Sequence, residues 1–113
     1  MNLKEYGQQA MTTMTSGHAF GDITPQLAAQ VLGLVGESGE VAEKLKKIIR
    51  DKEGVLSRQD RQEFVKELGD ILWYVNAVAC LLGSNIEEVA EKNLEKVLSR
   101  KARGVQHGSG DNR

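Results

Sequence analysis

The chain has 113 residues, 40% of them hydrophobic and 27% charged, with 15 basic and 16 acidic side chains and a net charge of −1. This length fits one domain, and a domain of this size buries a limited core, so association with further copies would stabilise it. The nearly balanced charge gives no general attraction to nucleic acid or to an anionic membrane, and we expect neither as a partner. The single cysteine, Cys80, excludes an intrachain disulfide and a multi-cysteine zinc site.

The sequence shows neither a membrane span nor a secretion signal. No apolar stretch reaches the roughly 18 residues that a transmembrane helix needs. The N-terminal residues Met1–Glu5 lack the apolar region of a signal peptide. A cytoplasmic protein is therefore expected.

Helical periodicity divides most of the chain into four segments. The first helix is predicted from about Leu3 to Thr15, with Asn2 as its N-cap, and a polar loop over Ser16–Ile23 follows. The second helix is predicted from Pro25 to about Arg50, because Thr24 suits the N-cap and proline suits the first helical position.

The second half of the chain predicts two more helices. Asp51–Leu56 is a predicted turn, after which Ser57 caps a third helix that ends at Gly83. Ser84–Glu87 has the spacing of a capping box, and the fourth helix is predicted from about Ile86 to Ala102.

The pattern predicts an all-α fold, since no segment alternates as a half-buried strand would. Short connections favour antiparallel neighbours, so we expect an antiparallel four-helix bundle-like domain over residues 1–104 that oligomerises through its helices, with a flexible tail over 105–113. The apolar residues expected to face inward on the last three helices are Leu27, Val31, Leu34, Val35, Val41, Leu45, Ile48, Ile49, Phe64, Leu68, Ile71, Leu72, Val75, Val78, Ala79, Leu82, Ile86, Val89, Ala90, Leu94, Val97 and Leu98.

Two acidic pairs of the same form lie in the second and third helices: Glu37 with Glu40, and Glu67 with Asp70. Positions three apart share a helix face, and both pairs fall on the same rotational side of the apolar stripe. In antiparallel helices the two acidic stripes, one formed by each pair, either converge or point apart, depending on the handedness of the pairing. Convergence would give four hard oxygen ligands suited to Mg²⁺ or Mn²⁺, and their mutual repulsion would favour a cation.

Several neighbours of the acids are candidate functional residues. Lys44, Lys47 and Tyr74 fall on the acidic flank, and Tyr74 either contacts a substrate or packs between helices. Trp73 faces away from the apolar centre, which favours an oligomer contact. Glycines inside the two helices indicate close approach of a helix or a ligand, with packing the favoured interpretation. They are Gly33, Gly36, Gly39 and Gly69.

Three segments resemble the MazG-type nucleoside triphosphate pyrophosphohydrolases of the all-α NTP pyrophosphatase superfamily. They are Gly33–Glu43, Lys66–Leu72 and Asn93–Arg100, and the resemblance extends from about Leu3 to Gly104. It implies a Mg²⁺-dependent hydrolase, with Mn²⁺ as an alternative ion, that converts a nucleoside triphosphate and water into a monophosphate and pyrophosphate. It also implies a homo-oligomer, either a dimer or a tetramer.

The resemblance further implies roles for individual residues. The acids that match the family's metal ligands are Glu37, Glu40, Glu67 and Asp70. The positions that match its substrate side are Lys44, Lys47, Tyr74, Asn93, Lys96, Arg100 and His18. Of the acids, Glu37 and Glu40 are the candidate general bases. His18 lies with Phe20 in the loop in which some relatives hold the nucleobase of the substrate.

Two alternatives stay open at this point. The related phosphoribosyl-ATP pyrophosphohydrolase of histidine synthesis has the same fold and the same metal chemistry. The second alternative is a catalytically silent helical interaction module, although such a module has no need of all four acids.

Overall fold

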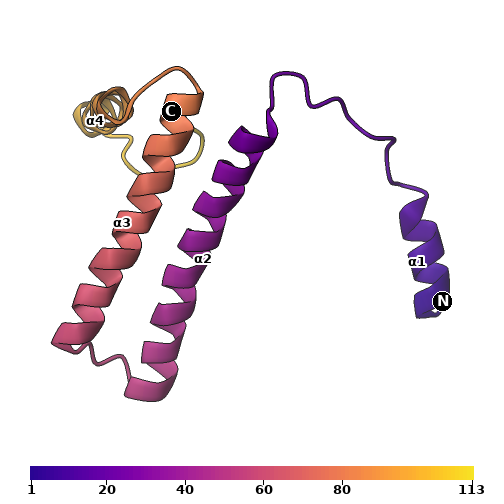
Figure 1. The fold of residues 1–113 in the computed structure, drawn as a ribbon, viewed down its shortest axis with the longest axis horizontal. Coiled ribbons are helices and arrows are strands. Elements are labelled where there is room, and N and C mark those ends of the chain that lie inside the picture. The colour runs from indigo at the N-terminus through magenta and orange to yellow at the C-terminus, as the bar shows by residue number, and fades with distance from the viewer.

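The structure, a computed structural model, describes all 113 residues and contains four helices and no strand. The helices are α1 (Leu3–Met11), α2 (Pro25–Lys52), α3 (Arg58–Leu81) and α4 (Ile86–Arg103) (Figure 1). The predicted all-α class is confirmed, and α2 and α3 form the antiparallel pair expected of a helical bundle (Figure 1).

Side-chain caps fix where each helix begins. In every case an oxygen of the N-cap residue accepts the backbone N–H of the third helical residue, which would otherwise lack a partner. The four caps are Asn2, Thr24, Ser57 and Asn85. The capping box predicted over Ser84–Glu87 does not form. The N-cap is Asn85, which accepts the N–H of Glu88 at 2.8 Å, and the Glu88 carboxylate accepts the Ser84 hydroxyl instead of the N-cap N–H.

The end of α1 differs from the prediction, since the helix stops at Met11 rather than Thr15. The hydroxyl groups of Thr12 and Thr13 donate to the carbonyl groups three residues earlier, at 2.7 Å each. Such side-chain bonds compete with the continuation of a helix, which explains the early stop.

α2 and α3 lie side by side along most of their length and are joined by a tight turn (Figure 1). The turn contains Glu53 and Gly54, both with positive φ, and the Gly54 N–H closes the end of α2 on the carbonyl of Ile48 at 3.1 Å. Ile48 and Ala79 are the buried apolar residues. A half-buried apolar seam lies between the two helices and includes Leu34, Val41, Phe64, Ile71 and Val75.

Much of the apolar surface predicted to face inward is exposed in the single chain. Only 4 of 113 residues are buried, and the radius of gyration is 20.0 Å, against about 13 Å for a compact chain of this length. The reason is that each long helix carries two apolar stripes, of which the α2–α3 pair covers one. The exposed members of the predicted set are Val31, Val35, Leu45, Ile49, Leu68, Leu72, Leu82, Val89, Ala90, Leu94, Val97 and Leu98.

The two outer helices extend away from this pair. α1 packs against no other helix and stands apart at the end of an irregular segment, with Leu3, Tyr6 and Met11 exposed (Figure 1). α4 crosses near the C-terminal end of α3, its nearest neighbour. None of the four helices has the length and apolarity that crossing a membrane would require.

Asp60, at the start of α3, fastens the turn between α2 and α3. Its carboxylate accepts hydrogen bonds from Lys52 Nζ at 2.9 and 3.0 Å and from the Ser57 N–H at 3.0 Å. These bonds, that of Lys52 foremost, lower the pKa of Asp60 from 3.8 to about 2. The ionised carboxylate therefore stabilises the fold fully above about pH 4, and the stabilisation is lost as the pH falls towards 2.

We predict that Asp60→Asn lowers the unfolding temperature by several degrees at neutral pH, because the amide replaces an ionised acceptor of Lys52. The difference from the wild type should shrink between about pH 4 and about pH 2. Thermal unfolding followed by circular dichroism at several pH values measures this. Asp22→Asn, in the exposed loop before α2, is the matched control. A difference that stays constant down to pH 2 would contradict the assignment.

Candidate metal centre

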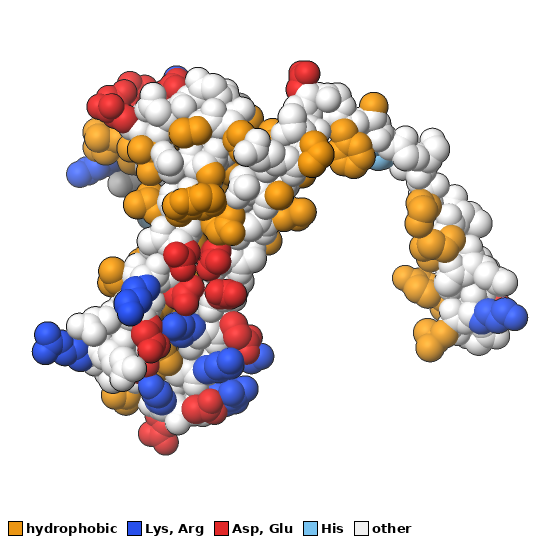
Figure 2. Space-filling view, in the orientation of Figure 1, with side chains coloured by type: hydrophobic (Ala, Val, Ile, Leu, Met, Phe, Trp, Pro, Cys, Tyr) orange, Lys and Arg blue, Asp and Glu red, His pale blue; other side chains and the backbone are white.

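Three carboxylates from α2 and α3 converge at the middle of the helix pair. One oxygen from each of Glu37, Glu67 and Asp70 lies within 4.8 Å of the other two. The acidic stripes therefore face each other, and the handedness that the sequence left open is decided. In Figure 2 this acidic cluster lies between a group of basic side chains on the turn side and an apolar patch on the other side.

The unpaired oxygens of this cluster fit a hard divalent cation. Oε2 of Glu37 and Oε2 of Glu67 are both buried and have no hydrogen-bond partner. A buried carboxylate oxygen without a donor is costly, and a cation removes that cost. Three carboxylates from two helices also supply the oxygen donors that Mg²⁺ and Mn²⁺ prefer.

Glu37 is the carboxylate most affected by the crowding. Its partial burial raises its pKa above the ordinary value, and the negative charges of Glu40, Asp70 and Glu67 raise the pKa further. Glu40 is exposed and lies beside Glu37, outside the three-carboxylate cluster. The structure thus gives three close carboxylates with a fourth as their neighbour.

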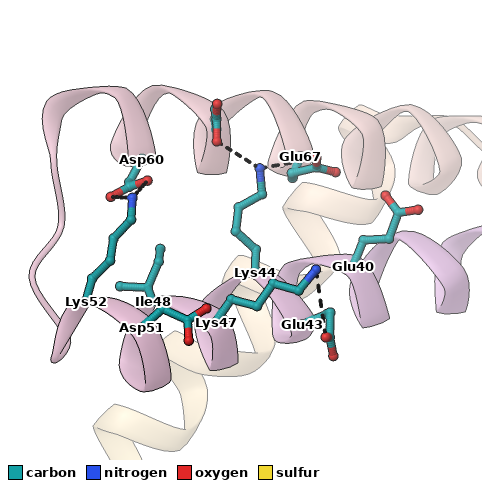
Figure 3. A pocket seen from close by; sticks show the side chains of 10 residues that line it. Glu40, Glu43, Lys44, Lys47, Ile48, Asp51, Lys52, Asp60 and Glu67 are labelled. Carbon is teal, nitrogen blue, oxygen red and sulfur yellow. Dashed lines mark hydrogen bonds and ion pairs between the residues drawn. The ribbon is translucent and has the colours of Figure 1, made fainter.

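Lys44 extends from α2 across to α3, where it meets two carboxylates (Figure 3). Its Nζ lies 3.3 Å from Oε2 of Glu63 and 3.7 Å from Oε1 of Glu67. A residue matched to the substrate side is therefore paired with acids. Glu63 was not among the predicted site residues, although its position four residues before Glu67 puts it on the same helix face.

A cavity of about 420 Å³ opens between α2 and α3 next to the acids (Figure 3). Its lining is charged except for Ile48, and Lys47 lies there with its Nζ 4.0 Å from Glu43. The lining residues are Glu40, Glu43, Lys44, Lys47, Ile48, Asp51, Lys52, Asp60, Glu63 and Glu67. With six carboxylates and three lysines, this lining has an excess of negative charge, which favours the binding of a cation.

A second cavity, of about 350 Å³, is lined by Glu37, Asp70, Trp73 and Tyr74. Tyr74 packs against Gly33, where any Cβ would collide with the tyrosine ring. The close approach predicted for the glycines is therefore found at Gly33, whereas a Cβ at Gly36, Gly39 or Gly69 would meet open space.

The two aromatic residues of this second cavity contact each other edge to face, with ring centroids 5.0 Å apart. Trp73 is 59% exposed and Tyr74 is half-buried. Tyr74 thus packs between helices and also lines a cavity beside the acids, so the two interpretations offered by the sequence are compatible.

Two of the three predicted substrate residues of α4, Lys96 and Arg100, bind the C-terminal segment of the chain. Lys96 Nζ lies 3.0 Å from Oδ1 of Asp111, and Arg100 donates to the Asp111 carbonyl at 2.7 Å. The hydrogen bond and charge of Lys96, with the hydrogen bond of Arg100, lower the pKa of Asp111. Neither cavity beside the acids includes a residue of α4, and Asn93 is exposed. No pattern in the sequence pointed to Asp111.

His18 lies in the segment between α1 and α2. Its ring nitrogen Nε2 is 3.3 Å from the hydroxyl of Thr15, and it lines neither cavity beside the acids. Phe20, in the same segment, is 76% exposed.

Comparison with known proteins identifies the family. Residues 26–105 match the MazG nucleotide pyrophosphohydrolase domain. The chain is 46% identical over 102 residues to a protein named Gene 37 protein from Mycobacterium phage L5, and the match covers 90% of each chain. No solved structure matches. The matched region includes nearly all of α2, the whole of α3 and α4, and the carboxylate cluster. The chain belongs to the MazG nucleotide pyrophosphohydrolase family, whose members generally use a divalent metal.

We predict that Glu37→Gln changes stability in opposite directions with and without metal. Without metal the variant should be at least as stable as the wild type, because one repelling charge is gone. Millimolar Mn²⁺ should raise the unfolding temperature of the wild type, since an ion at 100 times its dissociation constant contributes about 2.7 kcal/mol, and should raise that of the variant less than half as much. Differential scanning calorimetry measures both, with Glu95→Gln on the exposed face of α4 as control. If Mn²⁺ raised the unfolding temperature of both proteins equally, Glu37 would not be a ligand of the metal.

Proposed function

We propose that the chain is a Mg²⁺-dependent nucleoside triphosphate pyrophosphohydrolase, with Mn²⁺ as an alternative ion. It would convert an NTP or dNTP and water into the corresponding monophosphate and pyrophosphate. The observation that carries the proposal is the convergence of Glu37, Glu67 and Asp70, two of them with buried, unpaired oxygens, within a domain of this family.

The acids divide into metal ligands and a base. Glu37, Glu67 and Asp70 would hold the ion, which when bound supplies Lewis-acid stabilisation of charge on the phosphate oxygens. Glu40 is exposed and outside that group, so it is available to accept the proton of the attacking water, with Glu37 as the second candidate. The water oxygen bonds to the α-phosphorus as the bond to the bridging oxygen breaks, and that oxygen leaves with pyrophosphate.

The remaining predicted residues, apart from Lys44, would hold the nucleotide. Lys47 offers an ammonium group in the charged cavity, and Tyr74 with Trp73 offers aromatic surface for a base or sugar beside Glu37. The residues of α4 proposed to bind phosphate are Asn93, Lys96 and Arg100. That two of these bind the Asp111 carboxylate supports an oxyanion role, because carboxylates and phosphates use the same donors. His18 remains a predicted contact of the nucleobase.

We further propose that the active form is a homo-oligomer, either a dimer or a tetramer. The single chain exposes 9346 Å², whereas about 6,100 Å² is expected for a compact protein of 12.4 kDa. This excess of roughly 3,200 Å² is several times the ~800 Å² that each partner contributes to a standard interface. A second copy is the occupant we propose for the exposed apolar stripes. Neither nucleic acid nor a membrane is proposed as a partner, and a cytoplasmic location is part of the proposal.

The reaction is tested by product analysis. Full-length protein, Mg²⁺ and a panel of NTPs and dNTPs should yield monophosphate and pyrophosphate on ion-exchange chromatography, and EDTA should abolish the reaction. Asp70→Asn should lower kcat/KM at least about 100-fold, or ~2.7 kcal/mol, whereas Glu95→Gln should not change it. Diphosphate and phosphate as products would overturn the proposal. Absence of turnover across the panel and with phosphoribosyl-ATP would favour the silent module.

The oligomer is tested by sedimentation velocity. The wild type should sediment as a species of at least twice 12.4 kDa. Leu72→Glu, which puts a charge on an exposed apolar stripe of α3, should shift it towards smaller species and lower its unfolding temperature. Lys46→Glu, on a polar face, is the control. A wild-type monomer with a cooperative unfolding transition would contradict the proposal.

A further inference from the structure

The carboxylate of Glu67 has two different surroundings. Its Oε2 is buried and has no hydrogen-bond partner, and the residue belongs to the cluster with Glu37 and Asp70. Its Oε1 lies 3.7 Å from the ammonium group of Lys44. One oxygen is therefore open to a cation, while the other already faces a positive charge that the chain itself provides.

Lys44 is held more firmly than a surface lysine. Its side chain is 25% exposed, against 58% for Lys47 one turn further along α2. Two carboxylates one turn apart on α3, those of Glu63 and Glu67, flank its Nζ at 3.3 and 3.7 Å (Figure 3). Two anionic partners on a neighbouring helix fix the position of the ammonium group.

The location of Lys44 matters because many enzymes that cleave phosphate bonds use two metal ions. In such sites the ions lie about 3.5–4 Å apart and share ligands. A second ion that shared Glu67 and took Glu63 as a further ligand would stand where the Lys44 ammonium stands. Two cations cannot occupy that place together, because like charges repel strongly in a partly buried site.

We propose that Lys44 is a built-in cation that takes the place of a second metal ion, so that each subunit binds a single divalent ion at Glu37, Glu67 and Asp70. Lys44 is then a positioning residue that balances Glu63 and Glu67, instead of a ligand of the substrate phosphates. The proposal rests on the proposed function for the nature of the site, but it concerns the number of ions bound and not turnover.

The test counts Mn²⁺ ions bound by the full-length protein, using isothermal titration calorimetry and electron paramagnetic resonance. The wild type should bind one ion per chain. Lys44→Met, which keeps the length of the side chain but removes the charge, should double this to two, with magnetic coupling between the ions. Lys44→Arg should bind one, because the charge is restored. Lys46→Met, a neighbouring exposed lysine of the same helix, is the control and should also bind one.

Each outcome decides the matter. Two ions in the wild type, one ion in Lys44→Met, or no ion in any variant would overturn the proposal. If Lys44→Met does not fold, as judged by circular dichroism, Lys44→Gln replaces it and the wild-type count still stands as a test. One ion in the wild type and two in the variant, without cleavage of any nucleotide, would uphold this proposal and refute the proposed function. Nucleotide cleavage by a wild type that holds two ions would do the reverse.

Discussion

The antiparallel pairing of α2 with α3 is the constraint on which the rest of the molecule depends. It places the carboxylates of Glu37, Glu67 and Asp70 within 4.8 Å of one another, an arrangement that like charges oppose. Two features of the same pair hold it together against that repulsion. Asp60 fastens the turn through Lys52 and Ser57, and the half-buried seam between the helices removes apolar surface from water. The carboxylates thus repel one another at the middle of the helix pair, while the turn and the apolar seam hold the two helices together.

The same pairing leaves the protein with an incomplete core. A pair of helices covers one apolar stripe on each partner, and the remaining stripes need another surface. In this chain α1 stands apart and α4 crosses only the end of α3, so neither supplies that surface. The same two helices carry both the carboxylate cluster and many of the exposed apolar residues.

The basic residues divide into groups with different surroundings. Lys44 is enclosed between carboxylates, Lys47 is exposed in the charged cavity, and Lys96 and Arg100 bind the C-terminal segment through Asp111. Their sequence patterns do not distinguish them, since all lie on helices at spacings typical of solvated faces. Lys44 differs from the others because two carboxylates of the neighbouring helix α3 lie within 3.7 Å of its ammonium group, whereas the carboxylate near Lys47 belongs to the same helix as Lys47.

The sequence by itself determined what depends on residues within about one helical turn: the helical periodicity, the caps at Asn2, Thr24 and Ser57, the spacing of the acids, and the motifs that resemble the MazG family. The prediction that α1 extends to Thr15 was wrong for a local reason as well, because the hydroxyl groups of Thr12 and Thr13 end the helix early. Only the tertiary structure decided that the acidic stripes converge, that Lys44 pairs with Glu63, and that half of the apolar faces stay uncovered. These features depend on the rotation of one helix about its neighbour, and two amphipathic helices with the same sequence pattern can pack with either flank facing inward.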